Sequence, residues 1–162
     1  MRRRLAVLAA GSVMALALAG CASTTRAKPA TVGSTLTLND GMGDTVNVTL
    51  LKFEDPAPPA GPTDAPPAGD NLAEVLIKVT GLSGTYKYDA DDAVAVVGSN
   101  NQTYAGGPGR LAGCYSFESG QVSVAPGRSA IGCVAVEITK GIKAAKIEYD
   151  AGYVGTTGIW IP

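Results

Sequence analysis

Asn71–Thr80 (NLAEVLIKVT) is the stretch that decides the fold. Val75, Ile77 and Val79 occupy every second position within it. This period of two is typical of a β-strand with one buried face, because successive side chains of a strand point to opposite sides of the sheet. The stretch therefore predicts a half-buried strand.

The same period recurs on both sides of this strand. Short apolar runs are separated by clusters of Gly, Asn, Ser and Pro, which allow the chain to reverse direction. The other predicted strands span 35–38, 45–50, 93–97, 102–105, 115–124, 131–138, 145–149 and 159–161. No segment sustains the apolar stripe of a helix. Many short strands joined by turns predict an all-β fold, an antiparallel β-sandwich with a β-barrel as the architectural alternative.

One connection between the predicted strands is long. Residues 56–70 contain six of the ten prolines, and a proline has no backbone N–H to contribute to a sheet. We therefore predict an exposed Pro-rich loop between the second and third strands. A partner that recognises polyproline II could bind this loop, but the interpretation we favour is an inserted loop without such a role.

The amino terminus has the features of a bacterial lipoprotein signal. Arg2, Arg3 and Arg4 precede the uncharged apolar run 5–19, which is short for a membrane-spanning helix. Leu18-Ala19-Gly20-Cys21 follows and resembles the lipobox, in which small residues precede a cysteine that receives diacylglycerol. We predict that residues 1–20 are a lipoprotein signal peptide, cleaved between Gly20 and Cys21, and that Cys21 is the lipidation site. The alternatives are an uncleaved anchor and an ordinary secreted protein.

The predicted mature chain divides into a tether and one domain. Residues 21–31 comprise the lipidated cysteine and a small, polar, flexible tether, and residues 32–162 form the predicted sandwich. Ten basic residues remain against 14 acidic ones after cleavage, so the chain lacks the basic surface of a nucleic-acid-binding protein. We expect it to be held by the lipid on Cys21 at the cell membrane, facing the extracytoplasmic side.

Several segments in order resemble a known family. They are Val32-Gly33, Asn71–Thr80, Tyr88–Asp92, the Gly98–Asn100 turn before Tyr104, and Val124–Gly127 leading into Gly132–Val136. This order resembles the bacterial immunoglobulin-like lipoprotein domain of unknown function, and such domains are similar to the small secreted immunogenic protein of mycobacteria. The resemblance spans most of 31–162 and implies an extracytoplasmic immunoglobulin-like β-sandwich. It implies no established reaction, so no functional residue is carried over. The dense prolines and the two later cysteines depart from the pattern.

Cys114 and Cys133 form a candidate disulfide. An oxidising compartment favours the bond, and with Cys21 acylated the remaining cysteines are even in number. A regular hairpin turning at Pro126-Gly127 would place Cys133 opposite Gly120, roughly 20 Å from Cys114 along the strand, which forbids a bridge. If Pro126-Gly127 instead carries the chain from one sheet to the other, that objection lapses. The alternative to a disulfide is two small buried thiols.

The composition argues against most catalytic chemistry. The chain has no histidine, which removes the usual general base and the commonest zinc ligand. Gly106–Gly109 lacks the lysine and helix that a phosphate-binding loop requires, so it predicts a plain loop. We expect no catalytic residue, no cofactor and no metal site.

Acidic and aromatic residues offer two weaker candidates. Asp89, Asp91 and Asp92 could ligate calcium, but they lack the spacing of a calcium loop and predict a solvated turn, as does Glu54-Asp55.

Trp160 and the tyrosines could form a binding face, yet a sandwich needs large side chains in its core, so we expect Trp160 to pack there with its neighbours facing outward. The tyrosines are Tyr86, Tyr88, Tyr104, Tyr115, Tyr149 and Tyr153.

Two functions follow from these observations. The first is a nonenzymatic binding or interaction module at the bacterial cell envelope, using loops or an edge strand to contact an envelope or extracellular protein. The second is a carboxylate-dependent hydrolase or carrier acting on an envelope component, which requires acidic residues that converge in a pocket.

Overall fold

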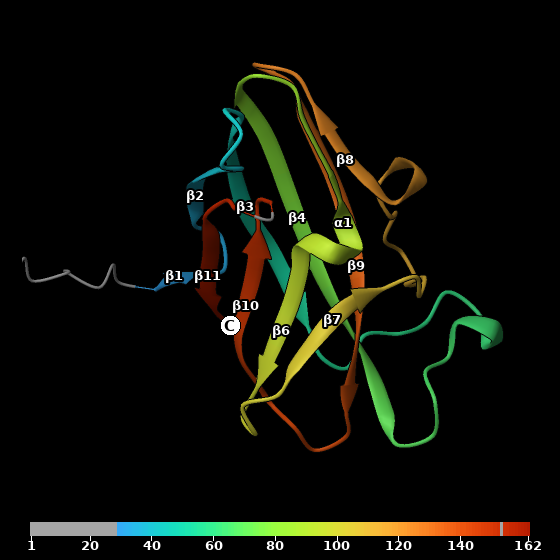
Figure 1. Ribbon diagram of the computed structural model, residues 1–162. Coiled ribbons are helices and arrows are strands. Elements are labelled where there is room, and N and C mark those ends of the chain that lie inside the picture. Colours follow the sequence, from blue (N-terminus) through green and yellow to red (C-terminus); the bar gives the residue numbers. More distant parts are fainter. Residues whose placement is uncertain (1–28, 153) are drawn as a thin grey trace, which may run out of the picture.

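The structure, a computed structural model, describes residues 29–152 and 154–162 (Figure 1). The predicted signal peptide, the cleavage site at Gly20 and Cys21, and most of the predicted tether lie outside these residues. Within the described ranges, no helix is long and apolar enough to cross a bilayer.

Strands and turns make up nearly all of the described chain, as the period of two predicts. The strands are β1 (Ala30–Thr31), β2 (Thr35–Asn39), β3 (Thr45–Glu54), β4 (Asp70–Ser83), β5 (Tyr86–Asp89), β6 (Val94–Gly98), β7 (Thr103–Gly107), β8 (Gln121–Val124), β9 (Ser129–Thr139), β10 (Ala144–Asp150) and β11 (Thr157–Ile161). The helical elements are the single turn α1 (Ala90–Ala93) and 3-10 turns at Pro62–Asp64 and Glu118–Gly120.

Nine strands of the described ranges form one sheet that folds over on itself. Their order is β1-β11-β10-β6-β7-β9-β4-β3-β2, and β5 pairs with β8 in a separate small sheet. Each pairing in the large sheet is antiparallel except that of β1 with β11. β7 pairs with β6 on one side and with β9 on the other, so the layer β9-β4-β3-β2 packs against the layer β6-β10-β11-β1 (Figure 1). The predicted all-β sandwich is confirmed.

The core lies between these layers and contains the side chains that alternate inward along the strands. The largest of them are Trp160, Tyr86, Tyr149, Leu50, Ile77, Ile138 and Ile147. The decisive stretch in β4 behaves as predicted, because Val75, Ile77 and Val79 are all buried in this core. Leu72 lies on the opposite face of β4, yet it is also buried, in a second and smaller cluster. That face is therefore covered by another part of the chain.

Three predicted elements differ from the structure. Residues 115–124 are not one strand, because Ser119 and Gly120 have left-handed backbone conformations (φ 54° and 71°) and only 121–124 continue as β8. Ala30–Thr31 of the predicted tether form β1 beside β11, and two residues are too few to show a period. Gly106 and Gly107, read as loop, pair with Val136 and Ala135 of β9.

Gly106 has a steric reason to be glycine. A Cβ at this position would lie 2.6 Å from both the Asp91 carbonyl oxygen and Val134 Cγ1, whereas a Cβ at Gly107 would meet nothing within 4 Å. The missing side chain therefore lets β7 pass between α1 and β9, where it joins the two layers.

Candidate functional site

The outer face of β4 and β9 is covered by a segment that we call the strap, residues 108–117. Its backbone runs beside β9, where the Cys133 N–H donates to the Tyr115 carbonyl (3.0 Å). At the end of the strap, Phe117 is buried against Gly132, whose missing Cβ makes room for the ring. Cys114 and Cys133 are joined by a disulfide in the structure, with their Cα atoms 6.1 Å apart.

The topology explains why this bridge can form. β8 pairs with β5 instead of forming a hairpin with β9, so Pro126-Gly127 connects two different sheets. The hairpin register that would separate the cysteines does not exist. Ser116 instead forms a parallel bridge with Cys133, which brings Cys114 alongside it.

The Pro-rich loop holds the other side of the strap. The Ala60 N–H donates to the Arg110 carbonyl and the Ala112 N–H to the Pro58 carbonyl, both at 2.9 Å. Arg110 also pairs with Asp64 at 3.2 Å. The prediction of an exposed loop is therefore incomplete. The loop also forms backbone hydrogen bonds with the strap, through the N–H of Ala60 and the carbonyl of Pro58.

A small hydrophobic cluster fills the space under the strap and the loop. It consists of Ala57, Leu72, Leu111, Cys133 and Ala135, with Leu76 and Cys114 packed against it. These side chains come from two neighbouring strands and from the two segments above them. The cluster therefore fixes the strap and the loop to the sheet.

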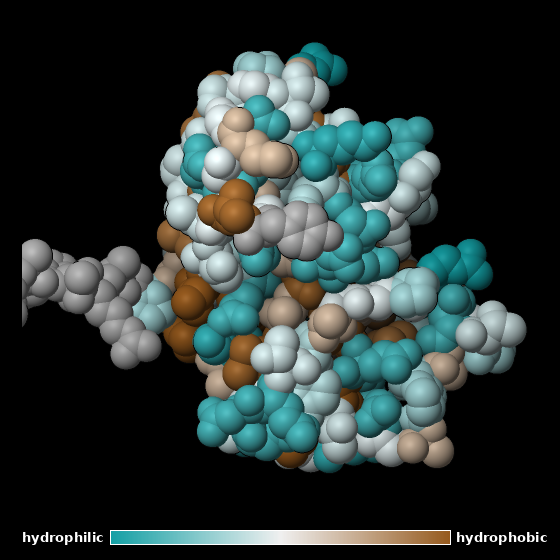
Figure 2. Space-filling model, in the orientation of Figure 1, coloured by the Kyte–Doolittle hydropathy of each residue, from teal (hydrophilic) through white to brown (hydrophobic). Residues whose placement is uncertain are grey.

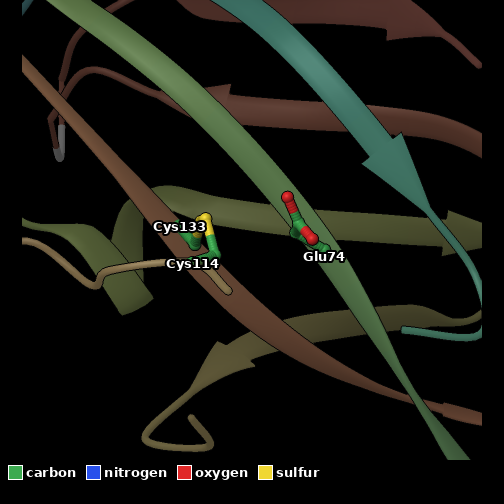
Figure 3. Close-up of side chains that lie close together, drawn as sticks. All are labelled: Glu74, Cys114 and Cys133. Carbon is green, nitrogen blue, oxygen red and sulfur yellow. A yellow bond between two sulfur atoms is a disulfide. The ribbon is translucent and has the colours of Figure 1, made fainter. Parts of the chain in front are cut away.

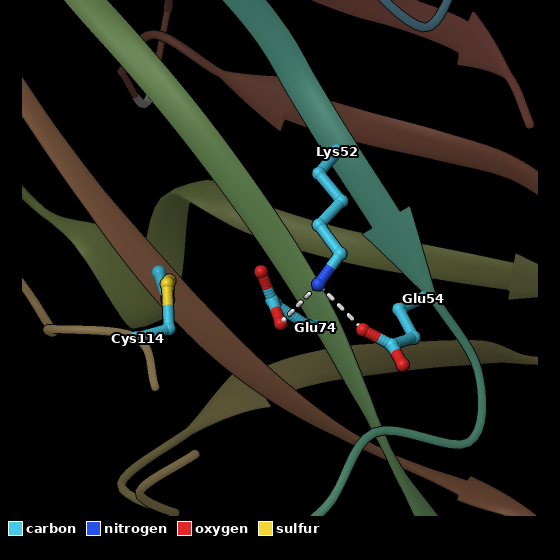
Figure 4. A network of polar contacts seen from close by, with 5 residues as sticks. Lys52, Glu54, Glu74 and Cys114 are labelled. Atoms are coloured by element: carbon cyan, nitrogen blue, oxygen red, sulfur yellow. Dashed lines mark hydrogen bonds and ion pairs between the residues drawn. A yellow bond between two sulfur atoms is a disulfide. The ribbon is translucent and has the colours of Figure 1, made fainter. Parts of the chain in front are cut away.

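Glu74 is a buried carboxylate beside this cluster. It accepts a hydrogen bond from Lys52 Nζ at 3.1 Å, and the same ammonium lies 2.5 Å from Glu54 (Figure 4). The Glu54 carboxylate, followed by that of Glu74, raises the pKa of Lys52 above its usual value. The lysine is thus held as a cation and is unsuited to act as a nucleophile or base. The pair Glu54-Asp55 is not the predicted solvated turn, because Glu54 is the last residue of β3 and its carboxylate pairs with Lys52.

Glu74 also lies near the disulfide (Figure 3). One oxygen of Glu74 and the sulfurs of Cys114 and Cys133 lie within 4.8 Å of one another. Metal binding by cysteine requires thiolates, which a disulfide does not provide. In this oxidised form, therefore, the two cysteines cannot ligate a metal together with Glu74.

The outward side of the strap presents a different chemistry. Tyr115 is 89% exposed although the backbone on both sides of it is fixed. A hollow of about 460 Å³ beside it is lined by strap residues 110–116 and by Ala60 of the Pro-rich loop. The strap therefore displays an aromatic side chain and Arg110 from a constrained backbone, next to a shallow concave surface.

The acidic calcium candidates are used locally. Asp89 caps α1, where its carboxylate accepts hydrogen bonds from the Asp91 N–H (2.9 Å) and the Asp92 N–H (3.4 Å). Burial raises the pKa of Asp91, and the neighbouring Asp89 and Asp92 carboxylates raise it further. The segment is a capped helical turn, more ordered than the solvated turn that the sequence predicts.

The aromatic residues divide between core and surface. Trp160 is buried as predicted, and its indole N–H donates to the Ser34 carbonyl at 3.0 Å. Tyr86 and Tyr149 are also buried, with their hydroxyls 3.1 Å apart. Tyr153 lies outside the described residues, and Tyr115 is on the strap. The described aromatic side chains thus do not gather on one binding face.

Comparison with known proteins adds information on the fold. No family model matches the chain, and no curated protein matches it. The crystal structure of MPT63, a secreted protein from Mycobacterium tuberculosis, matches 84% of this chain and 99% of its own with a TM-score of 0.58. The fold resembles that of MPT63. Because the sequence identity is 15%, the likeness to MPT63 is one of fold, and it agrees with the sandwich implied by the resemblance.

Sequence reasoning missed the strap and the Lys52–Glu74 contact. One signal was present in β4, where Leu72 and Leu76 flank Glu74 on the face opposite Val75. Apolar residues on both faces of a strand indicate that both faces are covered. The identity of the cover was not readable, since it depends on contacts between segments distant in sequence.

Proposed function

We propose that the chain is the precursor of an extracytoplasmic lipoprotein, anchored through Cys21, whose sandwich acts as a nonenzymatic interaction module. The lipobox-like segment ending at Cys21 supports the anchor, and the likeness to a secreted protein is consistent with the location. The proposed contact surface is the strap with the hollow beside it. Its proposed partner is a protein of the cell envelope or the extracellular space.

The observation that carries this proposal is the exposure of Tyr115 on a fixed backbone. Tyrosine and arginine are enriched among the residues that dominate binding energy in protein interfaces. A constrained segment loses little conformational freedom on binding, so more of its contact energy contributes to affinity. Tyr115 and Arg110 on the bridged strap satisfy both conditions.

The alternative, a carboxylate-dependent hydrolase or carrier, requires two free carboxylates facing one cavity. Glu54 and Glu74 do converge, but on the Lys52 ammonium that lies between them. The carboxylate of Asp89, another of the acidic candidates, already accepts hydrogen bonds from backbone N–H groups of α1. These contacts favour the interaction module over the hydrolase.

Site-specific photocrosslinking on intact cells tests the proposed surface. A photoreactive phenylalanine analogue replaces Tyr115 in one variant and the exposed Leu82, at the far end of β4, in a matched control. We expect a discrete adduct from position 115 and none from position 82. The captured partner should then bind Tyr115→Ala about tenfold or more weakly than wild type, as expected of an interface anchor.

The disulfide provides a second arm of this test. The double variant Cys114→Ser/Cys133→Ser frees one attachment of the strap, so we expect a weaker adduct at position 115 in a protein that remains folded. Equal adducts from positions 115 and 82, or full affinity in Tyr115→Ala, would contradict the proposed surface.

A further inference from the structure

A groove lies where the described chain begins. It has a volume of about 540 Å³ and runs between β2 and β11. It is lined by Pro29, Ala30, Leu36, Leu38, Ile159 and Ile161, together with three threonines and Lys146. The lining is thus mainly aliphatic side chains and threonines.

The surface around this groove is apolar as well. Ile159 and Ile161 are 37% and 40% exposed because they alternate with buried Trp160 along β11. Val32, which follows β1, is 39% exposed, and Thr31 of β1 pairs with Ile161. We call this surface the entry face and define it by the groove together with Val32. Figure 2 shows hydrophobic side chains (brown) gathered at this edge of the molecule, beside β1.

The short connection to Cys21 limits how far this face can lie from a membrane. Seven residues separate Cys21 from Pro29, so even a fully extended chain spans at most about 28 Å. A relaxed chain of that length averages roughly 16 Å. With Cys21 acylated, the entry face therefore lies within this distance of the bilayer.

The charges of the connection favour the same arrangement. Arg26 and Lys28 are the charged residues between Cys21 and Pro29, and both are basic. Basic residues close to a bilayer are attracted to anionic headgroups by about 1 kcal/mol each. Lys146 adds a long side chain at the groove, with its ammonium paired to Glu148 at 2.6 Å.

We propose that the entry face docks on the lipid bilayer that carries the anchor, with Ile159 and Ile161 in contact with lipid acyl chains. This inference rests on the proposed lipidation of Cys21. Two attachments, the acyl chains and this apolar surface, would fix the orientation of the sandwich and direct its other surfaces away from the membrane. The strap covers the outer face of β4 and β9, whereas the entry face lies at the two ends of the large sheet, where β2 and β11 line the groove.

Trp160 allows a direct test because it is the single tryptophan of the chain. It lies between Ile159 and Ile161, and its indole is bonded to Ser34 in the turn after β1. The protein, expressed in bacteria from the full-length chain and extracted from the cells with detergent, is reconstituted in vesicles of phosphatidylcholine and phosphatidylglycerol, with plain or dibrominated acyl chains. Bromine quenches indole fluorescence only at short range, so docking should lower the Trp160 emission about twofold in brominated vesicles, as expected for contact at the headgroup and acyl boundary.

Matched variants separate docking from anchoring. Ile159→Asp/Ile161→Asp should abolish the quenching, while Ile131→Asp, at a 58% exposed position on β9, should retain it. Near-ultraviolet circular dichroism in plain vesicles verifies that each variant is folded. Both sets of variants should still float with the vesicles, because the lipid on Cys21 is unchanged.

Flotation distinguishes the two ways in which the inference can fail. Wild-type protein that floats but shows equal emission in plain and brominated vesicles would overturn docking and leave the anchor intact. The same result is expected if the groove is filled by a second copy of the chain or by the protein's own acyl chain. Protein that does not float would overturn the anchor itself, and docking with it.

Discussion

Tyr86 and Tyr149 show how single polar groups are accommodated in this core. Each ring is almost fully buried, and the two hydroxyls satisfy one another at 3.1 Å. Burial raises the pKa of Tyr86 to about 12, and burial also raises the pKa of Tyr149 well above its ordinary value of 10.0. Both phenols therefore stay protonated in the folded protein at pH values where the unfolded chain ionises.

This difference predicts a loss of stability at high pH. Between pH 10 and about 12 the folded state retains a proton on Tyr86 that the unfolded state has released, so the free energy of unfolding is full below pH 10 and falls across this interval. Urea unfolding at several pH values measures the fall. Tyr86→Phe should reduce its slope, and at neutral pH should cost about 1 kcal/mol for the lost hydrogen bond.

Tyr104→Phe serves as the control, since its hydroxyl bonds to exposed Asn100 and Gln102. In this variant the fall of the unfolding free energy with pH should be as steep as in wild type. The raised pKa of Lys52 contributes to this fall in the same direction in every variant. An unchanged slope in Tyr86→Phe would show that this phenol does not titrate in the expected interval.

At the scale of elements, β7 determines how the two layers meet. It is five residues long and pairs with β6 through its first three residues and with β9 through Gly106 and Gly107. The first pairing holds it in one layer and the second in the other. The glycine at position 106 is therefore a requirement of the crossing, because α1 and β9 approach it from both sides.

Adjacent glycines provide a matched test of this crossing. Gly106→Ala places a methyl group 2.6 Å from the Asp91 carbonyl and Val134, so we expect it to lower the free energy of unfolding by about 1–3 kcal/mol. Gly107→Ala meets nothing within 4 Å and should change stability by less than about 1 kcal/mol. Thermal or urea unfolding compares them, and equal effects would contradict the proposed crossing.

Strands that alternate over many residues were predictable, whereas short or locally covered ones were not. Val75, Ile77 and Val79 identify β4 because one face of that strand packs on the main core. β5 and β1 were missed because they are four and two residues long. Residues 115–124 were predicted as one strand in the series of period-two runs, but the left-handed Ser119 and Gly120 break it. The cysteines signalled a bridge by their even number, while the register that permits it required the topology.

At the scale of the whole molecule, two surfaces and the core have different roles. The entry face lies next to the proposed anchor, the strap displays Tyr115, and the core between the layers supports both. The fold class was predictable because it follows from strand periodicity and turn spacing. The strap was not, since the disulfide, the Pro-rich loop and Glu74 meet only after the sheet has formed.

Metabolic labelling with palmitate tests the central claim, which is that Cys21 carries a lipid and holds the sandwich outside the cytoplasm. Wild type should incorporate the label and migrate as the cleaved form. Cys21→Ala should incorporate none and remain uncleaved, while the neighbouring Ser23→Ala should behave as wild type. Normal labelling of Cys21→Ala, or recovery of wild type from the cytosol at full length and without lipid, would contradict the account.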